Sequence, residues 1–247
     1  MPRSLLSAPS ALSALSALSA LLVLSALPAH AQVEVGHAPA DSPYLDLPRG
    51  HTVSLSGGLM SGGAGDLGLG PTGGAVFALR YDRRLSALVG ITGGVGLAML
   101  ERDVVHPDAP LDERFTGPVD QSVTLVDLGL HFNFTGDKSW RRLAPFLMLT
   151  GGFGFAGEPS ADTTSYEFGT KFFFQPGIGT RVILTPRLQL RAEALAVAWK
   201  LNYPSSFGDE PEADPGTPDD PNAVITDGQF EEWVVSPRLQ VGIGYTF

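Results

Sequence analysis

Few residues in this chain have the types and spacing that catalysis requires. His131 follows Asp127 by four residues, so the two side chains would share one face of an extended strand and could form a histidine–carboxylate pair. The sequence places no serine to complete a nucleophilic triad, and GxSxG, HExxH and P-loop motifs are absent. It therefore indicates no catalytic residues, no metal site and no cofactor, and we expect the protein not to be an enzyme.

A glycine-rich stretch has the spacing of a phosphate-binding loop. The runs Gly63–Gly68 and Gly68–Gly73 both match the GxGxxG pattern of dinucleotide sites. Such a loop binds phosphate where a helix begins at it, because the amide groups of the helix N-terminus hold the anion. The segment that follows here alternates like a strand, which argues against a nucleotide site.

The most strongly charged stretch is acidic. Residues 202–232 hold nine Asp and Glu residues and no Lys or Arg. Carboxylates can bind Ca²⁺ weakly, but the spacing matches no EF-hand loop and prolines interrupt it. We interpret the stretch as a solvated loop, with cation binding as the alternative.

The other ionisable residues stand on alternating positions, and this pattern identifies the elements that carry them. Eight segments alternate apolar residues with small or polar ones, a two-residue period that is typical of β-strands. The segments are His51–Met60, Thr72–Asp82, Leu85–Leu100, Gln121–Phe134, Leu143–Phe155, Lys171–Leu184, Leu188–Leu201 and Trp233–Phe247. Short and long connections follow one another in turn, and the long ones are 61–71, 101–120, 156–170 and 202–232.

Composition and the N-terminus indicate an exported protein. The chain has no cysteine, and its net charge of −10 argues against nucleic acid as a partner. Arg3, an apolar Ser/Ala/Leu tract and Ala29-His30-Ala31 form a signal-peptide pattern, so we expect cleavage near Ala31, with a retained anchor as the alternative. The predicted organisation is a signal peptide at 1–31, a periplasmic lead-in at 32–50 and a strand domain at 51–247.

The last strand carries a resemblance to a known family. In WVVSPRLQVGIGYTF, one face is apolar throughout, and the segment ends on Tyr245 and Phe247. It resembles the terminal strand of small bacterial outer-membrane β-barrels of the OmpA-like and OmpX-like type, whose final Phe serves as an assembly signal. The resemblance implies an all-β fold, an eight-stranded antiparallel up-and-down transmembrane β-barrel in the cell outer membrane. It also implies outer-membrane lipid, lipopolysaccharide and the barrel assembly machinery as partners, with Tyr245 and Phe247 as the assembly signal.

A soluble barrel of the lipocalin type has the same alternation, with its apolar face turned inward. Three features favour the membrane. The polar face is poor in charge, and aromatic residues gather toward both strand ends, as they do at two membrane interfaces. The export signal and the terminal Phe also fit the outer membrane. In a membrane the first and last strands should pair, because an unpaired sheet edge is not tolerated in hydrocarbon.

The polar face would then line the lumen, which in an eight-stranded barrel is only wide enough for side chains. We expect its charged members to pair and plug the barrel, with a proton or solute path as the alternative. An ion pair between Arg191 or Glu193 and another strand is expected, with Arg181 and Arg238 as members. The predicted lumen network consists of Arg80, Asp127, His131, Arg181, Arg191, Glu193 and Arg238.

The function we favour from the sequence is a non-enzymatic outer-membrane barrel with a polar plugged lumen and long surface loops. Its role would be structural, adhesive or protective, and an extracellular ligand is not identified. One alternative is a narrow outer-membrane channel for small or apolar solutes, similar to the OmpW family. The other is a lipid A-modifying enzyme, although no motif of such enzymes is found.

Overall fold

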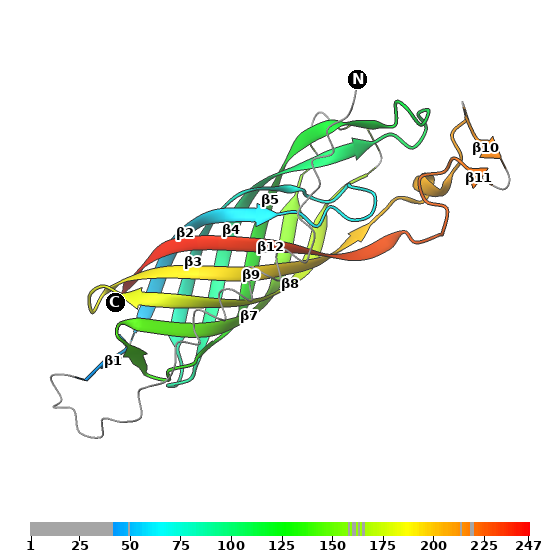
Figure 1. The fold of residues 1–247 in the computed structure, drawn as a ribbon. Coiled ribbons are helices and arrows are strands. Elements are labelled where there is room, and N and C mark those ends of the chain that lie inside the picture. The colour runs from blue at the N-terminus through cyan, green and yellow to red at the C-terminus, as the bar shows by residue number, and fades with distance from the viewer. Residues whose placement is uncertain are drawn as a thin grey trace. The chain divides into compact units, whose positions relative to one another are not determined.

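The computed structural model describes residues 42–48, 50–157, 159, 162, 164, 166–212, 214–217 and 220–247. The predicted signal peptide and most of the predicted lead-in lie outside these residues. Residues Tyr44–Phe247 form one unit built almost entirely of strands (Figure 1). Within the described residues, no helix is both long enough and apolar enough to span a membrane.

Eight long strands, each antiparallel to its neighbours, close into a barrel. The β2 strand pairs with β12 from Thr52↔Thr246 to Met60↔Arg238, so the first and last strands join as expected. The predicted fold class is therefore confirmed. The strands are β2 (His51–Ser61), β3 (Gly73–Arg84), β4 (Val89–Val105), β5 (Phe115–Asn133), β7 (Leu143–Ala156), β8 (Thr170–Ile183), β9 (Leu188–Asn202) and β12 (Glu231–Thr246).

The largest departure from the predicted strand boundaries is the β4–β5 hairpin. Residues 101–120 were expected to form a loop, but β4 continues to Val105 and β5 begins at Phe115. A register shift between Arg102 and Val104 marks the point where the hairpin continues past the ladders to β3 and β7. The alternation is weak in 101–120, which is why the sequence pattern did not extend the strands.

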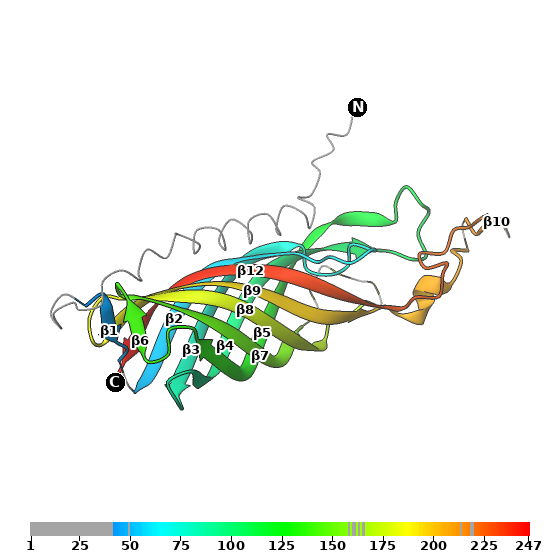
Figure 2. The ribbon, with the colours of Figure 1, turned by 60° about the horizontal axis from the view of Figure 1, so that its bottom comes forward.

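The two ends of the barrel differ in their connections. One end carries the turns 85–88, 134–142 and 184–187, and the C-terminus lies there too (Figure 2). Two short strands lie at this end, β1 (Tyr44–Asp46) and β6 (Lys138–Trp140), and they pair with each other. The other end carries the loops 62–72, 106–114, 157–169 and 203–230, the last of which contains η3 (Ser205–Gly208), β10 (Gly216–Thr217) and β11 (Asp220–Pro221).

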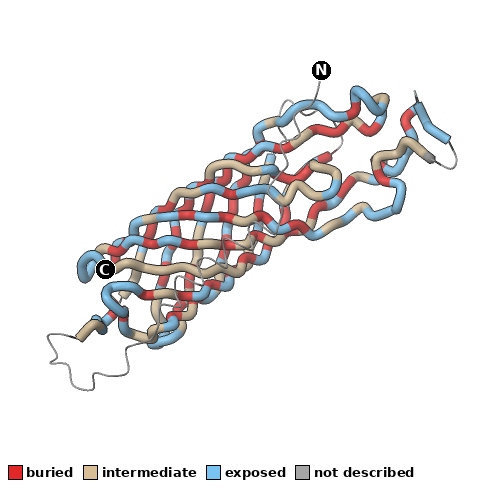
Figure 3. The backbone as a smooth tube through the Cα atoms, viewed as in Figure 1, coloured by how far each residue is buried: buried red, intermediate tan, exposed pale blue. Residues whose placement is uncertain are grey.

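Buried and exposed residues alternate along most of the long strands (Figure 3). The exposed positions are mainly apolar. Leu59, Leu128 and Val241 expose 68%, 70% and 67% of their surface, and many other large apolar residues of the long strands are exposed with them, which marks a surface that meets a partner or a membrane. Aromatic residues lie exposed near both ends, with Phe134 and Tyr245 toward the short turns and Trp233 toward the long loops. The outer face therefore has the composition of a surface that meets lipid.

Glycines on the inner face leave room for large side chains from neighbouring strands. A Cβ atom at Gly179 of β8 would lie 2.5 Å from the ring of Phe146 on β7. A Cβ atom at Gly177 would lie 2.2 Å from the side chain of Leu195 on β9. Large and small residues thus alternate around the narrow interior, which is filled by side chains.

Candidate functional site

Arg80 of β3 and Asp127 of β5 form a bidentate ion pair inside the barrel. The guanidinium nitrogens donate to the two carboxylate oxygens at 2.8 and 2.9 Å, and a further hydrogen bond of 3.1 Å goes to Thr92 on β4, the strand between them. A Cβ atom at Gly94 of β4 would lie 3.2 Å from the guanidinium, so glycine leaves space for the pair. Both charged side chains are buried, and each satisfies the other.

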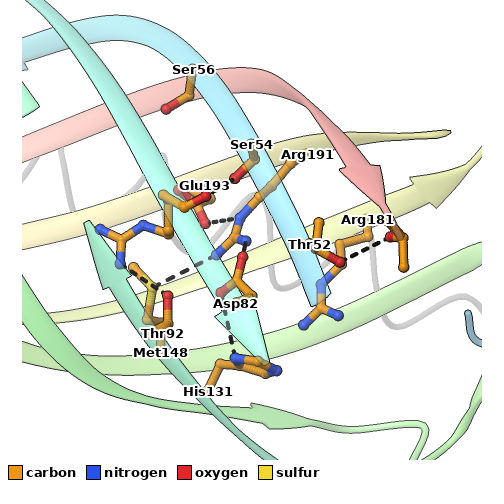
Figure 4. A network of polar contacts seen from close by, with 12 residues as sticks. Thr52, Ser54, Ser56, Asp82, Thr92, His131, Met148, Arg181, Arg191 and Glu193 are labelled. Atoms are coloured by element: carbon orange, nitrogen blue, oxygen red, sulfur yellow. Dashed lines mark hydrogen bonds and ion pairs between the residues drawn. The ribbon is translucent and has the colours of Figure 1, made fainter. Parts of the chain in front are cut away.

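Arg191 of β9 is the centre of a second network (Figure 4). It donates to Asp82 of β3 at 2.5 Å and also to Glu193, which in turn accepts a hydrogen bond from Gln240 of β12. The ring of Phe146 lies 4.8 Å from the centre of the guanidinium. The expected pair between Arg191 and another strand is therefore made with Asp82.

His131 and Arg181 lie beside this network, toward the short turns. The Nδ1 atom of His131 lies 3.6 Å from the carboxylate of Asp82. The carboxylate next to His131 is therefore Asp82 and not Asp127, which the sequence spacing suggested. Arg181 donates to the side-chain oxygen of Asn133 at 2.8 Å. His131, Arg181 and Arg84 line a small cavity of about 30 Å³. It lies next to a larger cavity of about 300 Å³ at the turn 85–88.

Arg238 lies on the inner face but lacks the partner that was predicted for it. It is 1% exposed, but among the described residues it forms no ion pair with Glu193, and its Nε and Nη2 atoms have no hydrogen-bond partner. Its guanidinium lies near Gly96 of β4, where a Cβ atom would be 3.8 Å away. Among the described residues, neither Arg181 nor Arg238 forms the predicted ion pair with Glu193. Arg181 lies opposite Arg191 on the neighbouring strand and donates to Asn133, so shared parity fixes the face of a residue but not its partner.

The lumen toward the long loops is apolar, whereas the sequence pattern predicted a polar lumen throughout. Buried side chains from the inner face and from three long loops form one cluster, so a polar plug fills only the half near the short turns. The inner-face apolar residues are interspersed with glycine and alanine, so the sequence pattern did not distinguish them from the rest of the inner face. The members include Met60, Leu100, Leu125, Phe173 and Trp199 from strands, and Leu69, Tyr166, Phe168, Phe207 and Ile225 from loops.

Polar contacts hold these loops over the cluster. Arg102, which is fully buried, pairs with Asp162 of the 157–169 loop and lies 5.0 Å from the ring of Tyr166. Burial alone would raise the pKa of Asp162, but hydrogen bonds from Thr164 and Arg102 outweigh it and hold that pKa below its ordinary value. The loop is thus fixed by a charge that is present at neutral pH.

A second contact fixes the 203–230 loop to the 62–72 loop. The Tyr203 hydroxyl donates to Glu232, and the same carboxylate accepts from the backbone amide of Asp66. Burial and the Glu232 hydrogen bond raise the pKa of the Tyr203 phenol well above its usual range. Glu232 was expected to belong to a solvated acidic loop, yet it is a structural acceptor.

The predicted assembly residues lie at the seam where the barrel closes. Tyr245 and Phe247 expose 48% and 65% of their surface on the outer face. Phe247 exchanges backbone hydrogen bonds of 2.9 and 3.1 Å with His51, and their rings stack with centroids 5.9 Å apart. These contacts continue the pairing of β2 with β12 to the last residue.

The described residues contain no cluster of three or more His, Asp or Glu side chains that could hold a metal ion. The Ser54 hydroxyl donates to the carbonyl of Arg80 at 3.5 Å, and no hydrogen bond in the described part of the chain joins it to His131. The described inner face brings opposite charges together, Arg80 with Asp127 and Arg191 with Asp82.

The chain is similar to solved structures of bacterial outer-membrane proteins. They include OprG from Pseudomonas aeruginosa (12% identity, 84% of this chain and 99% of that one, TM-score 0.49) and Neisserial surface protein A (14%, 83% and 98%, 0.46). Ail, the attachment invasion locus protein of Yersinia pestis, is a third (14%, 81% and 99%, 0.41). No family model and no curated protein matches the sequence. At these identities and scores the likeness assigns no function, and the barrel is established by its own strand pairing.

Proposed function

We propose that this protein is a non-enzymatic outer-membrane barrel that holds an ordered set of loops at the cell surface. The observation that carries the proposal is the filling of the lumen by two different layers. Ion pairs around Arg80 and Arg191 fill the half near the short turns, and the apolar cluster around Trp199 fills the other half. A barrel filled in this way acts as a rigid support for its loops.

The outer surface supports the membrane location. Aliphatic residues that are more than 60% exposed cover the outside of several strands, and such a surface is stable only against lipid. In an outer membrane the long loops face outward and the short turns face the periplasm. The lipid contacts of this surface would include phospholipid and lipopolysaccharide, and the barrel assembly machinery would recognise the seam at Phe247.

Three measurements test the proposal. A closed barrel in detergent migrates differently on a denaturing gel before and after boiling, and the protein should fractionate with the outer membrane. In planar bilayers, the purified protein should show no conductance above the lipid baseline. Identical gel migration together with recovery from the soluble periplasmic fraction would refute the proposal.

A narrow channel for small apolar solutes is the second candidate, because half of the lumen is lined by apolar side chains. A path through that half would have to pass Phe173 and Trp199, which are fully buried. Flux of an apolar dye into vesicles measures such a path directly. If the protein is a channel, the dye should cross through the wild type, and faster through Trp199→Ala. If the barrel is a filled support, the wild type should show no flux.

A further inference from the structure

The exposed cations of the described residues all lie at the short-turn end of the barrel. Lysine and arginine side chains elsewhere are buried or half-buried, and the half-buried Lys200 at the loop end pairs with Glu231. Exposed carboxylates, by contrast, are concentrated in the loops, including Asp108, Asp112 and Asp209. The exposed cations are Arg83, Lys138, Arg141, Arg142 and Arg187.

Two of these arginines occupy a backbone conformation that normally selects glycine. Trp140 pairs with Leu143, so Arg141 and Arg142 are the two central residues of a tight turn, with φ angles of +47° and +71°. Two-residue hairpin turns with positive φ at both positions favour Asn-Gly, and a side chain there costs conformational energy. Every other described residue in this range of φ is a glycine. Two adjacent arginines in this turn therefore lower the stability of the turn, and backbone strain of this kind is often found at binding sites.

The arginines lie on a continuous part of the rim. The amide of Ile183 donates to the carbonyl of Arg142 at 2.9 Å, which places the 141–142 turn next to the 184–187 turn. The amide of Thr246 donates to the carbonyl of Arg187 at 2.7 Å, so that turn adjoins the barrel seam. Figure 2 shows β6 and the start of β7 at the end of the barrel that carries the C-terminus.

The charges on this part of the rim are not neutralised, although the Arg142 guanidinium donates a hydrogen bond of 3.4 Å to the carbonyl of Leu184. Among the described residues, no ion pair joins Arg141, Arg142 or Arg187 to a carboxylate, whereas Lys138 pairs with Asp46 at 2.8 Å. The guanidinium of Arg141 lies 5.3 Å from the ring of Trp140, which is itself exposed on the outside. Apolar side chains of the lipid-facing surface, such as Leu184, begin directly beside these cations.

We propose that Arg141, Arg142 and Arg187 form a binding surface for anionic phospholipid headgroups in the leaflet that meets the short turns. The proposal rests on the membrane location proposed above. A guanidinium matches a phosphate with two parallel hydrogen bonds, and Trp140 and Leu184 provide the apolar contact that the glycerol and acyl region requires. A free phosphate would satisfy the charges alone, but it would not use the adjacent apolar surface.

The test compares phosphatidylglycerol with phosphatidylcholine of the same acyl chains, bound to the detergent-solubilised barrel and counted by native mass spectrometry. The key variant is Arg141→Asn/Arg142→Gly, which removes both charges and supplies the residues that the turn prefers. Arg141→Lys/Arg142→Lys keeps the charge, and Lys200→Gln removes a cation at the opposite end as a control.

Each cation near a membrane surface contributes about fivefold, so we expect the three arginines to make the wild type bind phosphatidylglycerol about a hundredfold more tightly than phosphatidylcholine. Arg141→Asn/Arg142→Gly removes two of them and should reduce that ratio by more than about tenfold. The same variant should unfold at an equal or higher urea concentration, which shows that the lost binding is not lost folding. The lysine variant should keep most of the preference, and Lys200→Gln should keep all of it.

Three results would overturn the proposal. They are an unchanged ratio in Arg141→Asn/Arg142→Gly, an equal loss in Lys200→Gln, or displacement of phosphatidylglycerol by millimolar inorganic phosphate, which would indicate a simple anion site. The outcome is separable from the membrane proposal. A protein that inserts and folds in vesicles but shows no headgroup preference refutes the binding surface alone, and a protein that fails to insert refutes the membrane location.

Discussion

The guanidinium of Arg191 lies 2.5 Å from the carboxylate of Asp82, and the two residues come from β9 and β3, strands that are not neighbours in the barrel. Backbone ladders connect only adjacent strands, so this ion pair joins parts of the wall that the sheet itself does not. Both side chains are almost fully buried, so each charge needs a partner, and Arg191 has a second one in Glu193. The pair therefore stabilises the barrel cross-section.

Removal of Asp82 should destabilise the folded barrel. We expect Asp82→Ala to lower the free energy of unfolding by about 1.5–3 kcal/mol, the usual contribution of a hydrogen bond to a charged group, because Arg191 keeps Glu193 as a partner. Urea unfolding in lipid vesicles, followed by tryptophan fluorescence, measures this change. Asp209→Ala, which removes an exposed carboxylate from a loop, should change stability by less than about 0.5 kcal/mol. Equal effects of the two substitutions would show that the lumen pair is well hydrated.

The Arg80–Asp127 pair offers a sharper test, because its members bond mainly to each other. Arg80→Met and Asp127→Leu should each destabilise the barrel by about 3–5 kcal/mol, since each leaves one buried charge. The double variant should recover much of the loss, because an apolar pair leaves no charge unpaired. A double-mutant cycle by urea unfolding gives the coupling energy. Strictly additive losses would mean that the two charges do not interact.

Inner-face glycines should tolerate substitution poorly. We expect Gly179→Ala to cost about 1–3 kcal/mol, because the new methyl group would lie 2.5 Å from Phe146 and 2.8 Å from the carbonyl oxygen of Ala192. Gly117→Ala is the matched control, since a Cβ atom there meets nothing within 4 Å. Thermal or urea midpoints of the two variants provide the comparison. Similar midpoints would indicate that the interior has spare room at β8.

The alternation of the sequence predicted the strands, their outward apolar face and the closure of β2 on β12, because all three follow from a two-residue period and backbone pairing. It also placed Arg191, Glu193 and Arg80 on the inner face. It did not predict which charges meet, because Asp82 and Arg191 are 109 residues apart and their levels depend on strand register. The register is set by the whole ladder and not by any local pattern.

The apolar half of the lumen was hidden for a different reason. Inner-face positions there read as Val76, Ala98, Leu125 or Val197 among glycines, so both faces of the strands are apolar near the loops and the alternation fades. The loop residues Tyr166 and Phe207 complete that core, and loop sequence has no period that would predict burial. Tertiary packing alone reveals it.

Acid should release the 157–169 loop through Asp162. Its pKa is lower in the folded protein than the ordinary value of 3.8, so the stabilisation is fully present above pH 3.8 and is lost as the pH falls through the lower folded value. Nuclear magnetic resonance titration of the Asp162 carboxyl gives the folded pKa directly. Arg102→Gln should raise it toward the ordinary value, while Arg187→Gln at the other end should not. A wild-type value at or above 3.8 would contradict the structural role of this pair.

Phe247 should affect assembly more than the stability of the finished barrel. Its ring is 65% exposed on the lipid side and stacks on His51, and its backbone hydrogen bonds with His51 do not depend on the side chain. We therefore expect Phe247→Ala to cost at most about 1.5–3 kcal/mol of stability and to refold almost normally into detergent. In cells, the same substitution should sharply reduce the yield of barrel in the outer membrane, because the resemblance to terminal assembly strands implies that this residue is recognised there. Phe134 is about equally exposed at the same end, so Phe134→Ala is the control. It should lower stability only by the lost burial of its ring, and it should not lower the yield in cells. Mild and equal effects of both substitutions in cells would remove the assembly role of Phe247.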